Sequence, residues 1–362
     1  MMVNSTRFAA QILGAGARGY AAMAADQFME LRPDIATAHG DDARSAWRAN
    51  LTQRLLELQT AVELDRPHLF VERVRWSRRA YQARAVAESE LRDALEALRG
   101  VLAEDLPPTG RDETLATLDA AIQDFANELD AEARALDPES ESGRFALRYL
   151  LSTLEGRSRE AIEELLESRR SNALSLRRCV VDVLVPAQRE IGRLWHAGDS
   201  DIAEEHLVTS TTKRALAALA HAGQPAGPRD LTLMTAAVQG DSHDIGGQAL
   251  IVLMEDSGWR CVDLGADVPA EDLVAARIAF EPTVVVVSAT LATQLPMLER
   301  SVRALRANAG GDVRIVVAGA ASATDPDLPQ SWGADATVDS VESALAQLEA
   351  WYPDVQDTAP GA

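Results

Sequence analysis

Hydrophobic residues recur along this chain with two different periods, and the period changes near residue 228. Before that point, apolar residues recur three and four positions apart, as do Leu91, Leu95, Leu98 and Leu102. This spacing predicts amphipathic helices. From Pro228 onward, short apolar runs alternate with amphipathic segments, which predicts strands and crossover helices. We therefore expect a multidomain fold of class α plus α/β.

The first 136 residues are rich in Ala, Leu, Glu and Arg and contain no strand-like run. Breaks are expected at Pro33, at Pro67 and at the pair Pro107 and Pro108, because proline ends or kinks a helix. Residues 1–136 are therefore expected to form an all-helical domain of roughly four to six helices. Residues 137–143 are polar, with one proline and one glycine, and are expected to form a linker.

The next region, residues 144–224, shows three strong helical patterns, at 144–166, 175–195 and 202–221. Pro186 interrupts the second pattern, where we expect a kink. Residues 228–352 then hold five apolar runs, at 231–238, 261–264, 283–288, 313–318 and 336–338. Amphipathic segments at 246–257, 270–280, 294–309 and 341–351 separate them. Strands this apolar predict a five-stranded parallel sheet covered on both faces, of flavodoxin-like type. The polar tail, residues 353–362, is expected to be disordered.

The composition narrows the class of protein. The chain has 362 residues, 47% of them hydrophobic, which is enough for two or three domains with cores of their own. No apolar run is long enough to span a membrane, and the first residues lack the layout of a signal peptide. Two cysteines, Cys179 and Cys261, cannot build a disulfide framework. We therefore expect a cytoplasmic protein. A net charge of −21 argues against nonspecific binding to nucleic acid.

One segment, from Gly240 to Gly246, carries the residues with the clearest chemistry. Asp241 stands two residues before His243, so that its carboxylate can hold the proton on one ring nitrogen and leave the other free for a metal. The segment follows the first predicted strand, at the edge where open α/β sheets bind ligands. Gly246 leaves room for a ligand at the start of the next helix. Taken alone, an Asp-x-His pair is more often a solvated turn.

The pattern Asp-x-His-x-x-Gly resembles the signature of cobalamin-binding domains, and here it reads Asp241, Ser242, His243, Asp244, Ile245 and Gly246. The resemblance implies that His243 is the lower axial ligand of cobalt. It also implies that the corrin edge and the nucleotide tail of the cofactor contact Val268, Ser288, Thr290, Leu291, Gly319 and Ala320. Ala320 stands where the family has a second glycine, which affects how closely the tail approaches.

A second resemblance lies in residues 144–224. The segment from Leu184 to Trp195, followed by the pair Glu205 and His206, resembles the four-helix bundle that caps cobalamin. Trp195, nine intervening residues and then this pair resemble the light-sensing cobalamin repressors of the CarH type. This resemblance implies adenosylcobalamin, with Trp195 beside the adenosyl group, Glu205 bonded to its ribose, and His206 as the upper cobalt ligand after light has expelled that group. The alternatives are a core tryptophan, a surface acid and an ordinary helical histidine.

These resemblances imply a photoreceptor rather than an enzyme. Light would break the cobalt–carbon bond and rearrange the cap, and a homo-oligomer would signal through the helical front domain or a downstream signalling protein. We do not expect DNA binding, because no winged helix is recognisable in residues 1–136. The rivals are a corrinoid methyl-group carrier of a methyltransferase system and a cobalamin sensor that is indifferent to light.

The helix expected over residues 67–81 interleaves aromatic residues with arginines, among them Arg73, Arg75, Trp76 and Arg78. The domain layout also resembles the photocobilins, which implies biliverdin as a second, noncovalent chromophore. This helix can clamp such an anionic pigment by stacking and by guanidinium bonds. The preferred alternative places Trp76 in the core and pairs the arginines with neighbouring carboxylates. No cysteine lies in this domain, so a thioether-linked bilin is excluded.

Overall fold

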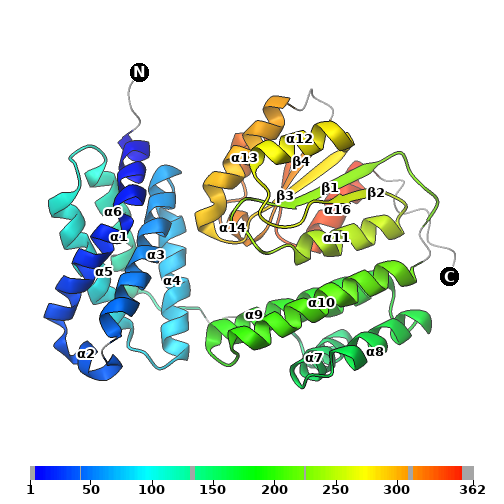
Figure 1. The fold of residues 1–362 in the computed structure, drawn as a ribbon, viewed down its shortest axis with the longest axis horizontal. Coiled ribbons are helices and arrows are strands. Elements are labelled where there is room, and N and C mark those ends of the chain that lie inside the picture. Colours follow the sequence, from blue (N-terminus) through cyan, green and yellow to red (C-terminus); the bar gives the residue numbers. More distant parts are fainter. Residues whose placement is uncertain (1–4, 41, 131–134, 224–225, 309–312, 353–362) are drawn as a thin grey trace. The chain divides into compact units, whose positions relative to one another are not determined.

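The computed structural model describes residues 5–40, 42–130, 135–223, 226–308 and 313–352 (Figure 1). The chain divides into two compact units, residues 1–132 and 133–362. The tail expected to be disordered, residues 353–362, lies outside the described residues. Among the helices of the described segments, none combines the length and the apolar character needed to cross a membrane.

The first unit is built from helices, as predicted. They are α1 (Ser5–Leu31), α2 (Pro33–His39), α3 (Ala43–Glu63), α4 (Pro67–Ala83), α5 (Glu88–Asp105) and α6 (Arg111–Gln123), followed by a 3₁₀ turn, Asp124–Ala126. Pro33 and Pro67 begin α2 and α4, where a missing N–H breaks no helical hydrogen bond. The predicted leucine stripe on α5 is completely buried at Leu91, Leu95, Leu98 and Leu102.

The second unit begins with the helical cap. Its helices are α7 (Glu141–Leu154), α8 (Ser158–Arg170), a π-helical segment (Arg178–Leu184), α9 (Val185–Ala197) and α10 (Ile202–Ala222). The single helical pattern expected over 144–166 is in fact two helices, because Gly156 turns the chain between them with φ +79°. Nor does Pro186 only kink its helix. The turns before it widen to π geometry, and the Val185 N–H reaches back five residues to the Val180 carbonyl.

The polar stretch expected as a linker is an ordered turn that caps α7. The Ser140 hydroxyl accepts the Gly143 N–H at 3.0 Å and donates to the Asp137 carbonyl at 2.9 Å. A side chain at Gly143 would collide with that carbonyl, so glycine is required there. Helix α7 therefore starts at Glu141, three residues earlier than the sequence pattern indicated.

The sheet confirms the predicted α/β class. Its parallel strands are β1 (Thr232–Ala237), β2 (Arg260–Asp263), β3 (Val284–Ser288), β4 (Arg314–Ala318) and β5 (Ala336–Val338), in the order β2-β1-β3-β4-β5. The helices between and after them are α11 (Ile245–Asp256), α12 (Ala270–Phe280), α13 (Leu295–Asn308), α14 (Ala320–Ala323), α15 (Leu328–Trp332) and α16 (Val341–Trp351), with a 3₁₀ turn at Ala292–Gln294. The predicted strand ends agree with these bounds to within one residue.

The cap and the sheet share one hydrophobic core. Figure 1 shows α10 lying alongside α11, while α12 and α13 cover the other face of the sheet. Leu216 and Leu219 of α10 belong to the same buried cluster as Leu250 and Leu253 of α11. The cap therefore packs directly on the helix that follows the Asp-x-His loop.

Candidate functional site

The loop after β1 is organised around Asp241, whose side chain is fully buried. One carboxylate oxygen, Oδ1, lies 2.7 Å from Nδ1 of His243 and accepts the His243 backbone N–H at 3.0 Å. The other oxygen, Oδ2, accepts the Thr290 backbone N–H at 2.8 Å. A buried carboxylate with these three partners fixes both the histidine ring and the loop after β3.

His243 is oriented as a metal ligand requires. Its hydrogen bond to Asp241 places the proton on Nδ1 and leaves the Nε2 lone pair available, and 57% of the side chain is exposed. That hydrogen bond raises the pKa of His243, burial opposes the rise, and the negative charges of Asp241, Glu205 and Asp244 add to it. Burial works to raise the pKa of Asp241, but hydrogen bonds from His243 and the charge of that residue prevail and lower it.

The other predicted site residues converge on the same carboxyl edge of the sheet. The Val268 N–H donates to the Ala237 carbonyl at 3.0 Å, which joins the loop after β2 to the end of β1. Ser288 ends β3 beside β1, and Ala320 follows β4 with an exposed side chain. Leu291 is 38% exposed at this edge. Ser242 and Gly246 are exposed, and Ile245 is half-buried.

The two glycines singled out in the sequence have different roles. A Cβ at Gly246 would meet nothing within 4 Å, so this position faces open space in which a ligand can lie. Gly319 has φ +101°, and a Cβ there would collide with the Ala289 carbonyl. Glycine at 319 is therefore needed to pack the loop after β4 on the loop after β3.

Gln294 is a site residue that the sequence analysis missed. Its Oε1 accepts the N–H groups of Thr290 and Leu291 at 3.0 and 2.8 Å, and its Nε2 donates to the Gly240 carbonyl at 3.0 Å. The side chain is 6% exposed. It thus ties the loop after β3 to the loop that carries His243. The available signal was a glutamine at the third position of a helix start, from which its side chain can reach back to the backbone N–H of Leu291.

The cap brings together a cluster of polar groups on α9 and α10. The amide Nε2 of Gln188 donates to Thr209 Oγ1 at 2.7 Å and lies 3.3 Å from Glu205 Oε1. Thr209 also donates to Glu205 Oε1, at 2.6 Å. Gln188 Oε1 is buried and has no hydrogen-bond partner within the described part of the chain. A buried acceptor without a donor fits a site whose ligand supplies hydroxyl groups.

Trp195 and His206 both have exposed side chains in this cap. Trp195 is 39% exposed, so the interpretation of Trp195 as an ordinary core residue is wrong. His206 is 72% exposed in its side chain, with Nδ1 2.8 Å from Glu205 Oε2, which leaves Nε2 free to face a ligand. His196, which directly follows Trp195, is a second cap imidazole that the sequence analysis did not single out, and it is 4% exposed.

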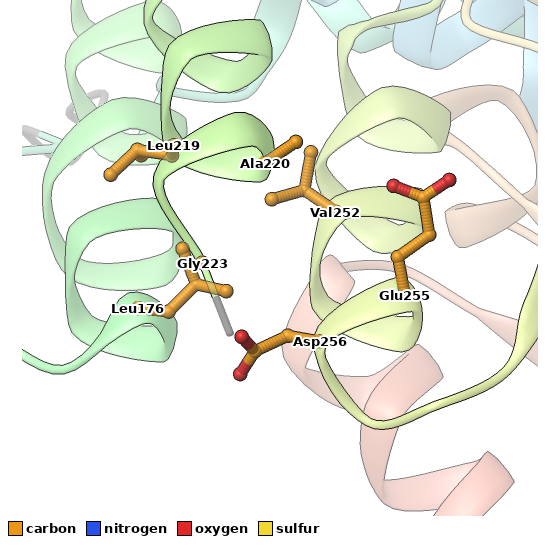
Figure 2. Close-up of a pocket in the computed structure, with 7 residues that line it drawn as sticks. All are labelled: Leu176, Leu219, Ala220, Gly223, Val252, Glu255 and Asp256. Atoms are coloured by element: carbon orange, nitrogen blue, oxygen red, sulfur yellow. The ribbon is translucent and has the colours of Figure 1, made fainter. Parts of the chain in front are cut away.

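A cavity of about 210 Å³ lies between the carboxyl ends of α10 and α11 (Figure 2), at the end of α11 away from His243. It is lined by Leu176, Leu219, Ala220, Gly223, Val252, Glu255 and Asp256. None of these residues belongs to the carboxyl edge of the sheet. The cavity is therefore separate from the candidate cobalamin site.

The arginines of helix α4 in the first unit pair with neighbouring carboxylates, as the preferred alternative to pigment binding predicted. Arg75 donates to both carboxylate oxygens of Asp124, at 2.8 and 2.7 Å, and Arg78 donates to Glu88 at 2.6 Å. Arg73 stacks on Trp76, with 4.4 Å from its guanidinium carbon to the ring centroid. Trp76 is half-buried rather than in the core. The arginines thus pair within the protein, and biliverdin binding stays a prediction.

Comparisons with known proteins agree with this geometry. Two family models, each described as a B12 binding domain, match residues 231–349 and residues 147–220. The chain is similar to the transcriptional repressors CarH and CarA of Myxococcus xanthus, with 30% identity over 39% of this chain and 46% of CarH, and 38% identity over 29% of this chain and 34% of CarA. It is also similar to a corrinoid protein of Desulfitobacterium hafniense, with 24% identity over 51% of this chain and 88% of that protein.

The chain spans less than half the length of either repressor. The two matched segments coincide with the cap and with the sheet whose loops position His243. Residues 147–220 and 231–349 are therefore B12-binding domains, and this chain is a cobalamin-binding protein.

Proposed function

We propose that this protein is a light sensor that binds adenosylcobalamin between the carboxyl edge of the sheet and the cap. His243 would hold cobalt from below, with Asp241 as its hydrogen-bond partner. Gly246 would leave room for the corrin, and the tail would run past Ser288, Thr290 and Leu291. Bound adenosylcobalamin would supply a cobalt–carbon bond that visible light breaks.

The observation that carries this proposal is the polar cluster of the cap, whose Gln188 lies on the same helix as the exposed Trp195. Glu205 and Gln188 present a carboxylate and a buried, unpaired amide oxygen, which suit the two hydroxyl groups of a ribose. Trp195 offers a rigid apolar wall of adenosyl size. Glu205 is also close enough to His243 for its charge to raise the pKa of that imidazole. In this proposal these groups would face the side of the site from which cobalt is approached.

Loss of the adenosyl group would free Trp195 and the start of α10 to move. A cap histidine would then bind cobalt from the cap side and hold the new arrangement. The cap would thus have two states, and loss of the ligand would favour the second. We propose His206 for this role because its side chain is exposed and its Nε2 is free. His196 would have to leave its buried position first. The new cap arrangement would change a homo-oligomer or the contact with a signalling partner.

The rival function is that of a corrinoid methyl-group carrier. Similarity to a corrinoid protein supports this alternative. A carrier needs an upper face open to partner active sites. A tryptophan wall with ribose-suited acceptors would obstruct that face. A cobalamin sensor that ignores light is the third candidate, and it would keep the adenosyl preference without a photoresponse.

The test is reconstitution in the dark with adenosylcobalamin, followed by absorption spectra and size exclusion before and after green light. We expect a stable bis-imidazole spectrum and a shift in elution, with the spectrum lost in His206→Ala. Loss in His196→Ala instead would move the upper ligand to that residue. Preference for methylcobalamin with no effect of light on spectrum or elution would overturn the photoreceptor in favour of the carrier, and adenosyl selectivity without a photoresponse would favour the light-independent sensor.

A further inference from the structure

Helix α10 runs parallel to α11 and extends beyond its start. Lys213 contacts Asp244, the residue just before α11, while Gly223 and Asp256 line the same cavity at the carboxyl ends of the two helices. The twelve residues from Ile202 to Lys213 therefore overhang α11 on the side of His243. At 1.5 Å per residue, this overhang is about 16 Å long.

The start of the overhang is lightly packed, whereas α10 is held firmly from Val208 onward. Ile202 is 55% exposed, and Val208 is the first buried residue of the helix. Thr211, Thr212, Ala215, Leu216 and Leu219 are all buried after it. The part of α10 that carries Glu205 and His206 is thus the part with the fewest apolar contacts, as a moving segment requires.

Lys213 stands where the overhang begins. Its Nζ lies 2.6 Å from Oδ1 of Asp244 and 2.9 Å from Oδ2. Gln248 donates to the same carboxylate at 2.9 Å, which holds Asp244 on α11. The Asp244 side chain is only 11% exposed and that of Lys213 is 37% exposed. This pair therefore joins the cap directly to the residue that follows His243.

Lys213 is also the only lysine of the sequence; apart from the histidines, all other basic residues are arginines. Glu205, Thr209 and Lys213 are spaced four residues apart, so that they form one polar stripe along α10. The stripe begins in the cluster suited to a ribose and ends at the loop of the lower ligand.

We propose that the Lys213–Asp244 ion pair is the anchor about which the overhang of α10 moves. The pair keeps α10 in register with the His243 loop, so that the start of the overhang swings while its base, from Val208 to Lys213, stays fixed. This inference rests on the proposed function for the movement itself. The pair is formed in the apoprotein, in the dark cobalamin-bound protein and after illumination.

The single lysine makes a direct test possible. Reductive methylation with ¹³C-formaldehyde labels Lys213 and the terminal amine while keeping the lysine charge. We expect the Lys213 methyl resonance to differ from that of the labelled Asp244→Asn protein. It should keep that distinct position in the apoprotein, after dark reconstitution with adenosylcobalamin and after green light. Coincidence with the Asp244→Asn position in any of the three states overturns the anchor.

An absorption spectrum of the same samples separates the two proposals. If light leaves the spectrum unchanged, the photoreceptor fails, and the apo and dark resonances still decide whether the pair is formed. If the spectrum changes and the lysine resonance moves to the Asp244→Asn position, the photoreceptor stands and the anchor falls.

Hydrogen exchange of the full chain gives a second readout. In Lys213→Met, amide exchange across residues 202–210 should accelerate roughly fivefold, the upper range for a partly exposed ion pair. Lys213→Arg should restore slow exchange. Arg214→Met removes the neighbouring, exposed cation of the same helix and serves as the matched control. Equal acceleration in Arg214→Met and Lys213→Met would contradict a specific anchor.

Discussion

Helix α4 of the first unit and the carboxyl edge of the sheet both concentrate charged and aromatic residues, but they use them in opposite ways. On α4, Arg75 and Arg78 pair with carboxylates of the same unit, and Arg73 covers Trp76. At the sheet edge and its cap, a buried amide oxygen lacks a partner among the described residues, a tryptophan is exposed and Gly246 faces open space. The charges of α4 are thus used within the protein, whereas the exposed tryptophan and the open space at Gly246 leave room for a ligand.

The largest effect is expected from His243→Ala, which removes the proposed lower ligand. Cobalamin affinity should fall by more than roughly 100-fold, which is the largest loss expected when only a hydrogen-bond partner of a metal ligand is removed. The absorption spectrum of any remaining complex should show cobalt without a protein imidazole below. His221→Ala, at an exposed histidine of α10, is the control and should leave both unchanged. Equal spectra for the two variants would remove His243 from the site.

Gly319→Ala and Gly246→Ala distinguish a glycine that is needed for packing from one that leaves room for a ligand. Gly319→Ala should lower the free energy of unfolding of the apoprotein by roughly 2–5 kcal/mol, through backbone strain and collision with Ala289. Gly246→Ala should leave that free energy nearly unchanged and instead weaken cobalamin binding. Denaturant unfolding and a binding titration measure the two quantities. A destabilised Gly246→Ala protein with normal affinity would contradict the distinction.

Asp241→Asn tests the hydrogen bond that orients His243 and leaves the proposed cobalt ligand itself in place. Cobalamin affinity should fall about 10- to 100-fold, because an amide holds the proton on Nδ1 of His243 less strongly. A titration followed by absorption measures the change. Asp230→Asn removes the same charge at an exposed residue before β1, at the amino end of the sheet, and serves as the control. Unchanged affinity in Asp241→Asn would mean that this hydrogen bond does not orient the imidazole.

The smallest of these effects is expected in the first unit, from Asp124→Asn. Hydrogen bonds from Arg75 are the main cause of the lowered pKa of Asp124, and burial opposes them. The stabilisation is therefore present above the ordinary aspartate pKa of about 3.9 and is lost as the pH falls through the lower folded pKa. Asp124→Asn should cost roughly 1–2 kcal/mol at neutral pH and flatten the loss in acid. Denaturant unfolding at several pH values checks both, and cobalamin affinity should not change.

Much of this fold could be predicted because local patterns determine it. The apolar runs of the five strands and the leucine stripe of α5 report burial residue by residue, and the Asp-x-His spacing alone places Asp241 beside His243. The break at Gly156 was missed because a helical pattern continues on both sides of it. The π-helical turns before Pro186 have no sequence signal that we can name.

The contacts that complete the site could not be predicted for a different reason. Gln188 meets Thr209 across 21 residues of sequence, Lys213 meets Asp244 across 31, and Gln294 meets Gly240 across 54. Each depends on how the cap and the loops pack, which no local period encodes. The role of Gly319 likewise appears only once Ala289 lies beside it.

The most direct test of the account is to identify the nitrogen below cobalt. Protein labelled with ¹⁵N-histidine would be loaded with cobalamin and reduced chemically to its paramagnetic Co(II) form, and its electron paramagnetic resonance compared with that of unlabelled protein. If His243 is the lower ligand, each cobalt line should split into a doublet in the labelled protein and a triplet in the unlabelled one, and His243→Ala should abolish the difference. Triplets in both samples would show that the nitrogen belongs to the base of the cofactor itself, and would contradict the site described for His243.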